Sequence, residues 1–134
     1  MKKILLITYL FYSLNISADL LQEGIVASEK GNLEYAKKSW TKACENGVMK
    51  ACDKLGEMYY FGYGVQQYQI KAKELYKKVC DAGNGEDCTK IARMYDNGYT
   101  VKEDKSKAMQ FYKKACDDGF EEGCKNYFNL KRKE

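Results

Sequence analysis

The sequence contains no histidine and no proline among its 134 residues, and both absences narrow the possible structures. Zinc in hydrolases is usually held by histidine, so a metallohydrolase site of that kind has no ligands here. Without proline or a low-complexity linker, nothing divides the chain into separate domains. No stretch alternates apolar and polar residues as a half-buried strand does. We therefore predict an all-α domain with no metal site and no cofactor.

The chain also lacks a strong excess of one charge. Its formal net charge is +4, and removal of Lys2 and Lys3 would lower it to +2. Acidic and basic residues are interspersed, which argues against a nucleic-acid partner. The basic C-terminal residues 131–133 are few enough to be a solvated helix end.

The N-terminus has the pattern of a secretory signal peptide. Two lysines precede an apolar run over residues 4–14, and Asn15-Ile16-Ser17-Ala18 follows. We predict cleavage after Ala18, so that residues 1–18 are the signal peptide and residues 19–134 form the mature domain. We therefore expect a secreted or periplasmic protein that is not stably inserted in a membrane after cleavage. The alternative is an N-terminal membrane anchor, although the apolar run is shorter than the roughly 20 residues that a membrane span needs.

A period of 36 residues organises the mature chain. Residues 36–65 recur in altered form as residues 72–101, and the pattern begins a third time at Ala108. Such a period is typical of repeat proteins. We predict a half-repeat over 19–35 and repeats over about 36–71, 72–107 and 108–131.

Six cysteines keep this register, each pair being separated by seven residues. Zinc sites usually have shorter cysteine spacings or include histidine, so export and an even count favour disulfides. Six cysteines allow 15 pairings. The repeat selects one of them: Cys44–Cys52, Cys80–Cys88 and Cys116–Cys124.

Apolar spacing predicts about seven helices in the mature chain. Asp104 is a favourable N-cap for the sixth, whereas Tyr68 at the equivalent position one repeat earlier is not. The expected ranges are 19–30, 33–45, 49–61, 70–81, 86–96, 105–117 and 121–131.

The pattern A-x3-[WY]-x2-[AVK]-[AV]-C-x7-C-x2-[LI]-[GA]-x2-Y, followed by a glycine-rich turn, resembles the Sel1-like repeat, a relative of the tetratricopeptide repeat. With its Cys-x7-Cys element it resembles the Helicobacter cysteine-rich protein family. The resemblance extends over residues 36–124 and implies a short right-handed αα superhelix. It also implies penicillin binding and β-lactam hydrolysis, because members of that family are described as β-lactamases.

The residues themselves give little support to that activity. Serine β-lactamases need S-x-x-K together with S-D-N and K-T-G elements. Ser39 and Lys42 form an S-x-x-K match, but the other two elements are absent. Because the mature chain is rich in lysine, one such match is expected by chance about 40% of the time. The pair is a weak catalytic candidate.

The alternative is a non-enzymatic interaction module. In tetratricopeptide-like stacks, one face of the first helix of each repeat lines a groove. We expect that groove to bind a peptide, a protein or a cell-wall fragment, although a plain solvated face would have the same composition. Its predicted residues are Lys50, Asp53, Glu57, Tyr60, Glu86, Thr89, Arg93 and Asp96.

Overall fold

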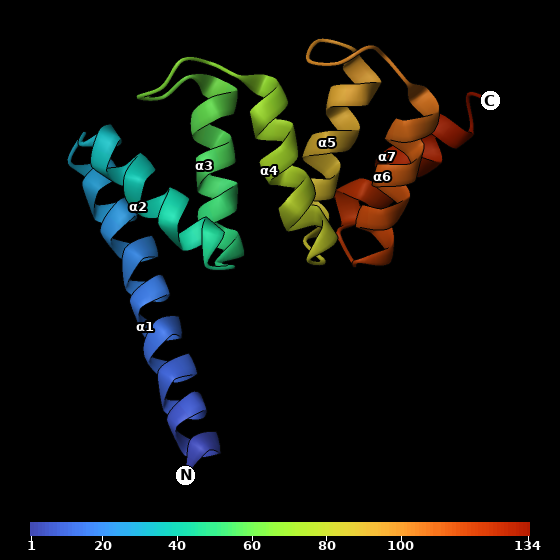
Figure 1. The fold of residues 1–134 in the computed structure, drawn as a ribbon. Coiled ribbons are helices and arrows are strands. Elements are labelled where there is room, and N and C mark those ends of the chain that lie inside the picture. Colours follow the sequence, from blue (N-terminus) through green and yellow to red (C-terminus); the bar gives the residue numbers. More distant parts are fainter. The chain divides into compact units, whose positions relative to one another are not determined.

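The computed structural model describes residues 1–134 and contains seven α-helices and no strand (Figure 1). The all-α prediction is therefore confirmed. The helices are α1 (Lys2–Glu29), α2 (Leu33–Glu45), α3 (Met49–Phe61), α4 (Gln69–Asp81), α5 (Gly85–Asn97), α6 (Lys105–Asp117) and α7 (Glu121–Lys131).

The predicted helix bounds hold to within one residue except in α1. We expected a helix to begin at Asp19, but α1 begins at Lys2 and runs through the predicted signal peptide without a break. No glycine or proline occurs before Gly24, so nothing in the apolar run interrupts a helix.

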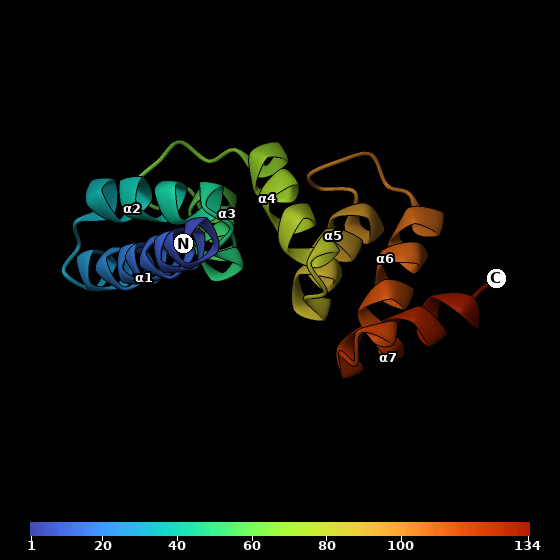
Figure 2. The same ribbon diagram turned by 60° about the horizontal axis from the view of Figure 1, so that its bottom comes forward.

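The chain folds as two compact units, Met1–Leu55 (unit 1) and Gly56–Glu134 (unit 2). In unit 1, α1 and α2 lie side by side in both views (Figure 1, Figure 2). The indole Nε1–H of Trp40 donates to the carbonyl of Leu21 at 3.2 Å. Trp40 can approach because Gly24 has no side chain, and a Cβ there would overlap the indole ring. The glycine thus sets the spacing between α1 and α2.

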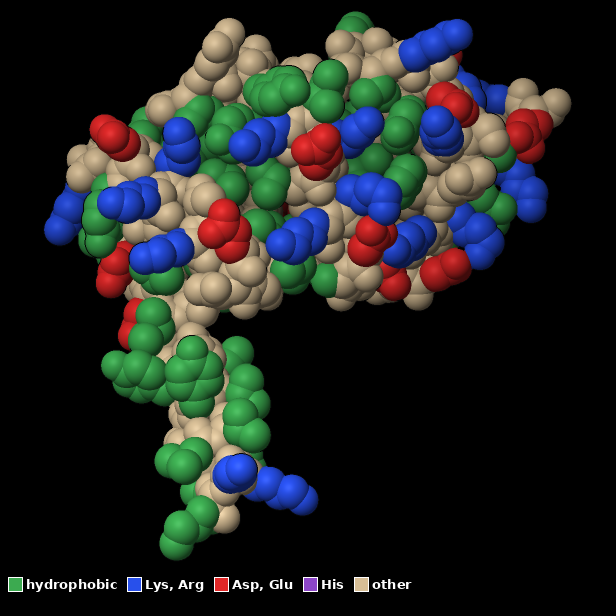
Figure 3. All heavy atoms as spheres, viewed as in Figure 1, with side chains coloured by type: hydrophobic (Ala, Val, Ile, Leu, Met, Phe, Trp, Pro, Cys, Tyr) green, Lys and Arg blue, Asp and Glu red, His purple; other side chains and the backbone are tan.

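The packed part of α1 begins at Ser17, the first buried residue of the chain. Before it, the apolar side chains of residues 4–16 are exposed, and this part of α1 projects as a rod of apolar side chains (Figure 3). By length and composition α1 could cross a membrane, and an N-terminal signal sequence would pass the same criterion.

Small residues allow the helices of unit 2 to pack closely. Ala72, Ala92, Ala108 and Ala115 are fully buried. Aromatic rings at one shared repeat position, Tyr76 and Tyr112, fill the larger spaces between helices. These tyrosines are therefore core residues, and their recurrence at one repeat position fits that role.

Side-chain caps fix several helix starts. The Asp104 carboxylate accepts from the backbone N–H of Lys107 at 2.9 Å, as predicted. Asn84 caps α5 in the same way through the N–H of Asp87. Tyr68 gives α4 no side-chain cap.

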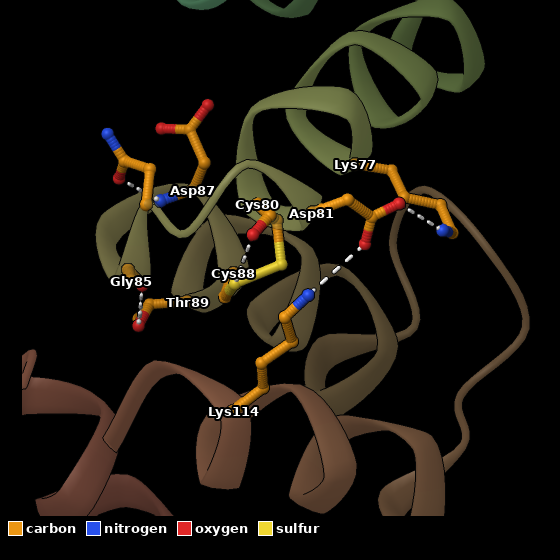
Figure 4. The surroundings of a disulfide bond; sticks show 9 residues. Lys77, Cys80, Asp81, Gly85, Asp87, Cys88, Thr89 and Lys114 are labelled. Atoms are coloured by element: carbon orange, nitrogen blue, oxygen red, sulfur yellow. Dashed lines mark hydrogen bonds and ion pairs between the residues drawn. A yellow bond between two sulfur atoms is a disulfide. The ribbon is translucent and has the colours of Figure 1, made fainter. Parts of the chain in front are cut away.

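The three disulfides are Cys44–Cys52, Cys80–Cys88 and Cys116–Cys124, the pairing that the repeat predicts. Each one ties the end of one helix to the start of the next. Figure 4 shows Cys80–Cys88 beside Asp81, which accepts hydrogen bonds from Lys77 and from Lys114 of α6. The hydrogen bond from Lys77 is the main cause of the lowered pKa of the Asp81 carboxyl. This disulfide is therefore bordered by a hydrogen bond that joins α4 to α6.

Candidate functional site

Unit 2 contains a pocket of about 190 Å³ between the C-terminal half of α3 and the middle of α5, with α4 contributing one ring. We call it the aromatic pocket. Its lining residues are Glu57, Tyr60, Phe61, Tyr76, Lys90, Arg93 and Met94. The volume is comparable to that of one large side chain, and most of the lining is aromatic or apolar.

The floor of the pocket is the ring of Tyr76, which is buried. This ring lies against Gly56, where an added Cβ would be 2.7 Å from Tyr76 Cε1. Tyr60 contributes a wall, with its ring centroid 6.4 Å from that of Tyr76, and Phe61 meets Tyr60 edge-on at 4.9 Å. The end of α3 and the middle of α4 thus bring three rings around one space.

Lys90 places a cation inside this apolar lining. Its ammonium lies 4.8 Å from the centroid of the Tyr76 ring and 3.2 Å from the carboxylate of Asp87, and only 17% of its side chain is exposed. Glu57 lies 3.7 Å from the same ammonium. Two carboxylates and a ring face therefore hold Lys90 in one position.

Arg93 forms the outer border of the pocket, where it makes an ion pair with Glu122 of α7. Both side chains are about half exposed. Exposed ion pairs contribute little to stability, so we interpret this pair as a charged rim rather than as part of the core.

The structure brings together three of the predicted groove residues, Glu57, Tyr60 and Arg93, in the aromatic pocket. Asp96 lies farther along α5, where it accepts from Lys105 at 2.7 Å and from the Tyr112 hydroxyl at 3.3 Å. Burial, reinforced by Asp96, raises the pKa of the Tyr112 hydroxyl. This neutral hydroxyl and Asp96 join α5 to α6.

Thr89 does not line an exposed groove. Its side chain is 1% exposed, and its hydroxyl donates to the carbonyl of Gly85 one helical turn earlier. The tetratricopeptide pattern placed it on the open face, but in this helix that position faces inward. Glu86 is exposed beside Lys90, at 3.9 Å from its ammonium. In unit 1, Lys50 is exposed and Asp53 is half-buried.

The weak catalytic candidate lies in unit 1, on α2. Ser39 is 3% exposed, whereas Lys42, one turn later, is exposed. A nucleophilic serine has to be reached by its substrate, and the hydroxyl of Ser39 is covered in this structure.

Unit 1 also contains an open hollow of about 560 Å³, lined by Asp19, Gln22, Glu23, Val26, Ala27, Lys30, Asn32 and Tyr35. There the Tyr35 hydroxyl donates to Glu23 at 2.8 Å, which raises the pKa of Tyr35.

Sequence reasoning missed four of the seven pocket residues, Phe61, Tyr76, Lys90 and Met94. A signal for them exists in the differences between repeats. Moving 36 positions along the chain replaces Tyr60 by Asp96 and Lys90 by Asn126, while Tyr76 becomes another tyrosine, Tyr112. The framework recurs, and the polar and aromatic residues around it vary.

Comparisons with known proteins agree with this architecture. The Sel1 repeat family model matches residues 50–84 and 86–120, just over half of the chain. No curated protein matches it by sequence.

Solved structures share the fold. A Sel1 repeat protein from Oxalobacter formigenes is 24% identical with a TM-score of 0.73, over 83% of this chain and 46% of that one. A protective antigen from uropathogenic Escherichia coli strains, which displays an SLR fold, is 22% identical with a TM-score of 0.74, over 85% and 25%. Helicobacter pylori cysteine rich protein B is 25% identical with a TM-score of 0.70, over 92% and 95%. This chain thus spans less than half of the first two, and the likenesses confirm the predicted fold class.

Proposed function

Because the chain belongs to the Sel1 repeat family, we propose that it is a protein-interaction module whose aromatic pocket binds a side chain of a partner polypeptide. The observation that carries this proposal is the pocket itself. It combines rings from Tyr60, Phe61 and Tyr76 with a rim that alternates in charge. Sel1 repeats are generally protein-interaction modules, which fits such a pocket.

The chemistry of the lining defines the partner. A volume of about 190 Å³ accepts one aromatic or large aliphatic side chain, and Met94 offers an adaptable thioether beside the rings. Hot spots of protein interfaces have this form, with an apolar anchor inside a pocket and polar groups around it. The rim carries charges of both signs, Glu57 beside Lys90 and Arg93 beside Glu122.

Selection from a random peptide library on the immobilised full chain tests the proposal. Selected peptides are expected to share an aromatic or large aliphatic residue. Tyr60→Ala is expected to raise their Kd by about tenfold or more, because it removes a wall of the pocket. Tyr99→Ala, the same substitution on an exposed loop, is the control and leaves the Kd within about twofold. Peptides that bind both variants equally well would contradict the proposed pocket.

Hydrolysis of β-lactams stays a prediction from the family resemblance. The buried Ser39 gives it no accessible nucleophile in this structure. Turnover of a chromogenic cephalosporin by the oxidised protein, lost in Ser39→Ala, would establish it. We place the interaction role first because the pocket supports it directly.

We also propose that residues 1–18 are a cleaved signal peptide and that the protein is secreted or periplasmic. Two observations support export: three disulfides, which persist in oxidising compartments, and the exposed apolar half of α1. Mass spectrometry of the N-terminus of the protein from its own cells tests the cut after Ala18.

A further inference from the structure

Two loops of unit 2 expose aromatic rings at the same end of its helices. The α3–α4 loop carries Tyr63 and Tyr68, which are 57% and 53% exposed, and the α5–α6 loop carries Tyr99, which is 89% exposed. Both loops lie along one edge in Figure 1. The hydroxyl of Thr100 donates to the side-chain oxygen of Gln69 at 2.9 Å, which joins the second loop to the start of α4. The rings therefore belong to one surface.

We call this surface the loop end and define it as residues 62–73 and 98–109. The opposite end of the same helices, the turn end, consists of residues 78–88 and 114–124, around the second and third disulfides. The two ends differ sharply in charge. The loop end has five lysines and two carboxylates, a formal charge of +3, and its first segment has no acidic residue. The turn end has two lysines and seven carboxylates, a formal charge of −5, and of these carboxylates only Asp87 is buried. Lys77 and Lys113, one residue outside this range, pair with Asp81 and Asp117 and leave the end acidic.

The residues of the loop end indicate what it contacts. Exposed Lys71 and Lys102 accompany the rings of Tyr63, Tyr68 and Tyr99. Lysine is depleted at protein–protein interfaces, where tyrosine is enriched. Surfaces that lie on anionic lipid are enriched in both, because tyrosine rings sit at the level of the headgroups and lysines are attracted to the lipid phosphates. The combination favours a lipid surface over a protein partner.

We propose that the loop end of unit 2 docks reversibly on an anionic lipid surface. The rings of Tyr63, Tyr68 and Tyr99 enter the headgroup layer, and the exposed Lys71 and Lys102 contact the lipid phosphates. The acidic turn end is repelled by the same surface, which orients unit 2 with its loops toward the lipid. This contact uses loop residues outside the proposed function, which assigns the aromatic pocket to a polypeptide.

Hydroxyl-radical footprinting of the full chain with lipid vesicles tests this orientation. The measurement reports on each ring separately, so a contact that the apolar part of α1 makes with lipid is recognised by protection of Tyr9 and Tyr12. Phosphatidylglycerol vesicles are expected to lower the oxidation of Tyr63 and Tyr99 by about threefold, and phosphatidylcholine vesicles to leave it unchanged. A protein or another soluble partner as the true ligand predicts no protection by either lipid, and that result overturns the proposal.

Charge variants give the second arm. Lys71→Gln with Lys102→Gln is expected to raise the amount of phosphatidylglycerol needed for half-protection by more than about tenfold. Lys77→Gln with Lys113→Gln removes the same charge from α4 and α6 toward the turn end and is the matched control, expected to change it by less than about twofold. Equal effects of the two double variants, or equal protection by both lipids, would contradict an oriented contact.

Discussion

At the scale of single residues, the aromatic pocket depends on a position that has no side chain. Gly56 lies on α3 directly beneath the ring of Tyr76, and Gly24 has the same relation to Trp40 in unit 1. Trp40 and Tyr76 are one period of 36 residues apart, whereas Gly24 and Gly56 are 32 residues apart because the α1–α2 connection is four residues shorter than the α3–α4 connection. A ring that rests on a glycine is held close to the helix axis, which leaves room for Tyr60 and Lys90 above it.

Gly56→Ala is therefore expected to lower the free energy of unfolding, although alanine is the better helix former. The new Cβ would be 2.7 Å from Tyr76 Cε1, and overpacking of this kind costs about 1–3 kcal/mol. The gain in helix propensity offsets about 1 kcal/mol of this cost. Urea unfolding followed by circular dichroism measures the change. Gln110→Ala on the exposed face of α6 is the control, and a variant at Gly56 as stable as that control would show that the ring moves aside without cost.

At the scale of helices, the sequence predicted the framework well and the pocket only in part. Bounds and disulfide pairing followed from residues that every repeat shares, such as Ala72 and Ala108, because shared positions face the same neighbours. Glu57, Tyr60 and Arg93 were predicted from an idealised helix face. The same reasoning predicted an exposed Thr89 and was wrong, because a small hydroxyl that donates to a backbone carbonyl of its own helix is easily buried. Lys90 was missed because its position depends on Asp87 and Tyr76, two neighbours that no linear pattern displays.

The third disulfide is expected to be the first to be reduced. Cys52, Cys80 and Cys88 are fully buried and Cys44 nearly so, whereas Cys116 and Cys124 are only half-buried. Thiol–disulfide exchange needs access to a sulfur atom, so a soluble phosphine or dithiol reaches this pair first. Timed reduction followed by alkylation and peptide mass spectrometry identifies the order.

Opening that bridge removes the cross-link between α6 and α7, which then remain covalently joined only through the backbone of residues 118–120. By the chain-entropy estimate a loop of this length contributes about 2.6 kcal/mol, so the singly reduced form is expected to be less stable by up to that amount. Cys116→Ser with Cys124→Ser measures the same loss without a reductant. Simultaneous labelling of all six cysteines would instead show that reduction follows global unfolding.

At the scale of the whole chain, unit 2 shows how surface chemistry is distributed along the helices. In unit 2 the pocket lies between α3 and α5, the rings and lysines lie at the loop end, and the carboxylates lie at the turn end. Alternating helix connections produce this division, because long connections follow α3 and α5 while short disulfide-bonded turns follow α4 and α6. One repeat unit thus presents two unlike ends, and adding repeats extends both.

The apolar half of α1 is the part of the chain that the fold does not use. Packing of α1 on α2 begins at Ser17, and the apolar side chains of residues 4–16 are exposed to solvent. A chain that begins at Asp19 is therefore expected to keep its midpoint of urea unfolding, with a change in free energy within about 0.5 kcal/mol. The same chain is expected to lose the self-association that an exposed apolar helix causes, since large apolar patches drive aggregation. Size-exclusion chromatography and urea unfolding of both forms measure the two effects separately.

As a control, a chain that begins at Gly31 lacks the hydrogen bond between Leu21 and Trp40 and is expected to unfold at a lower urea concentration. If the chain beginning at Asp19 is destabilised to the same extent, the apolar half of α1 is part of the folded unit after all.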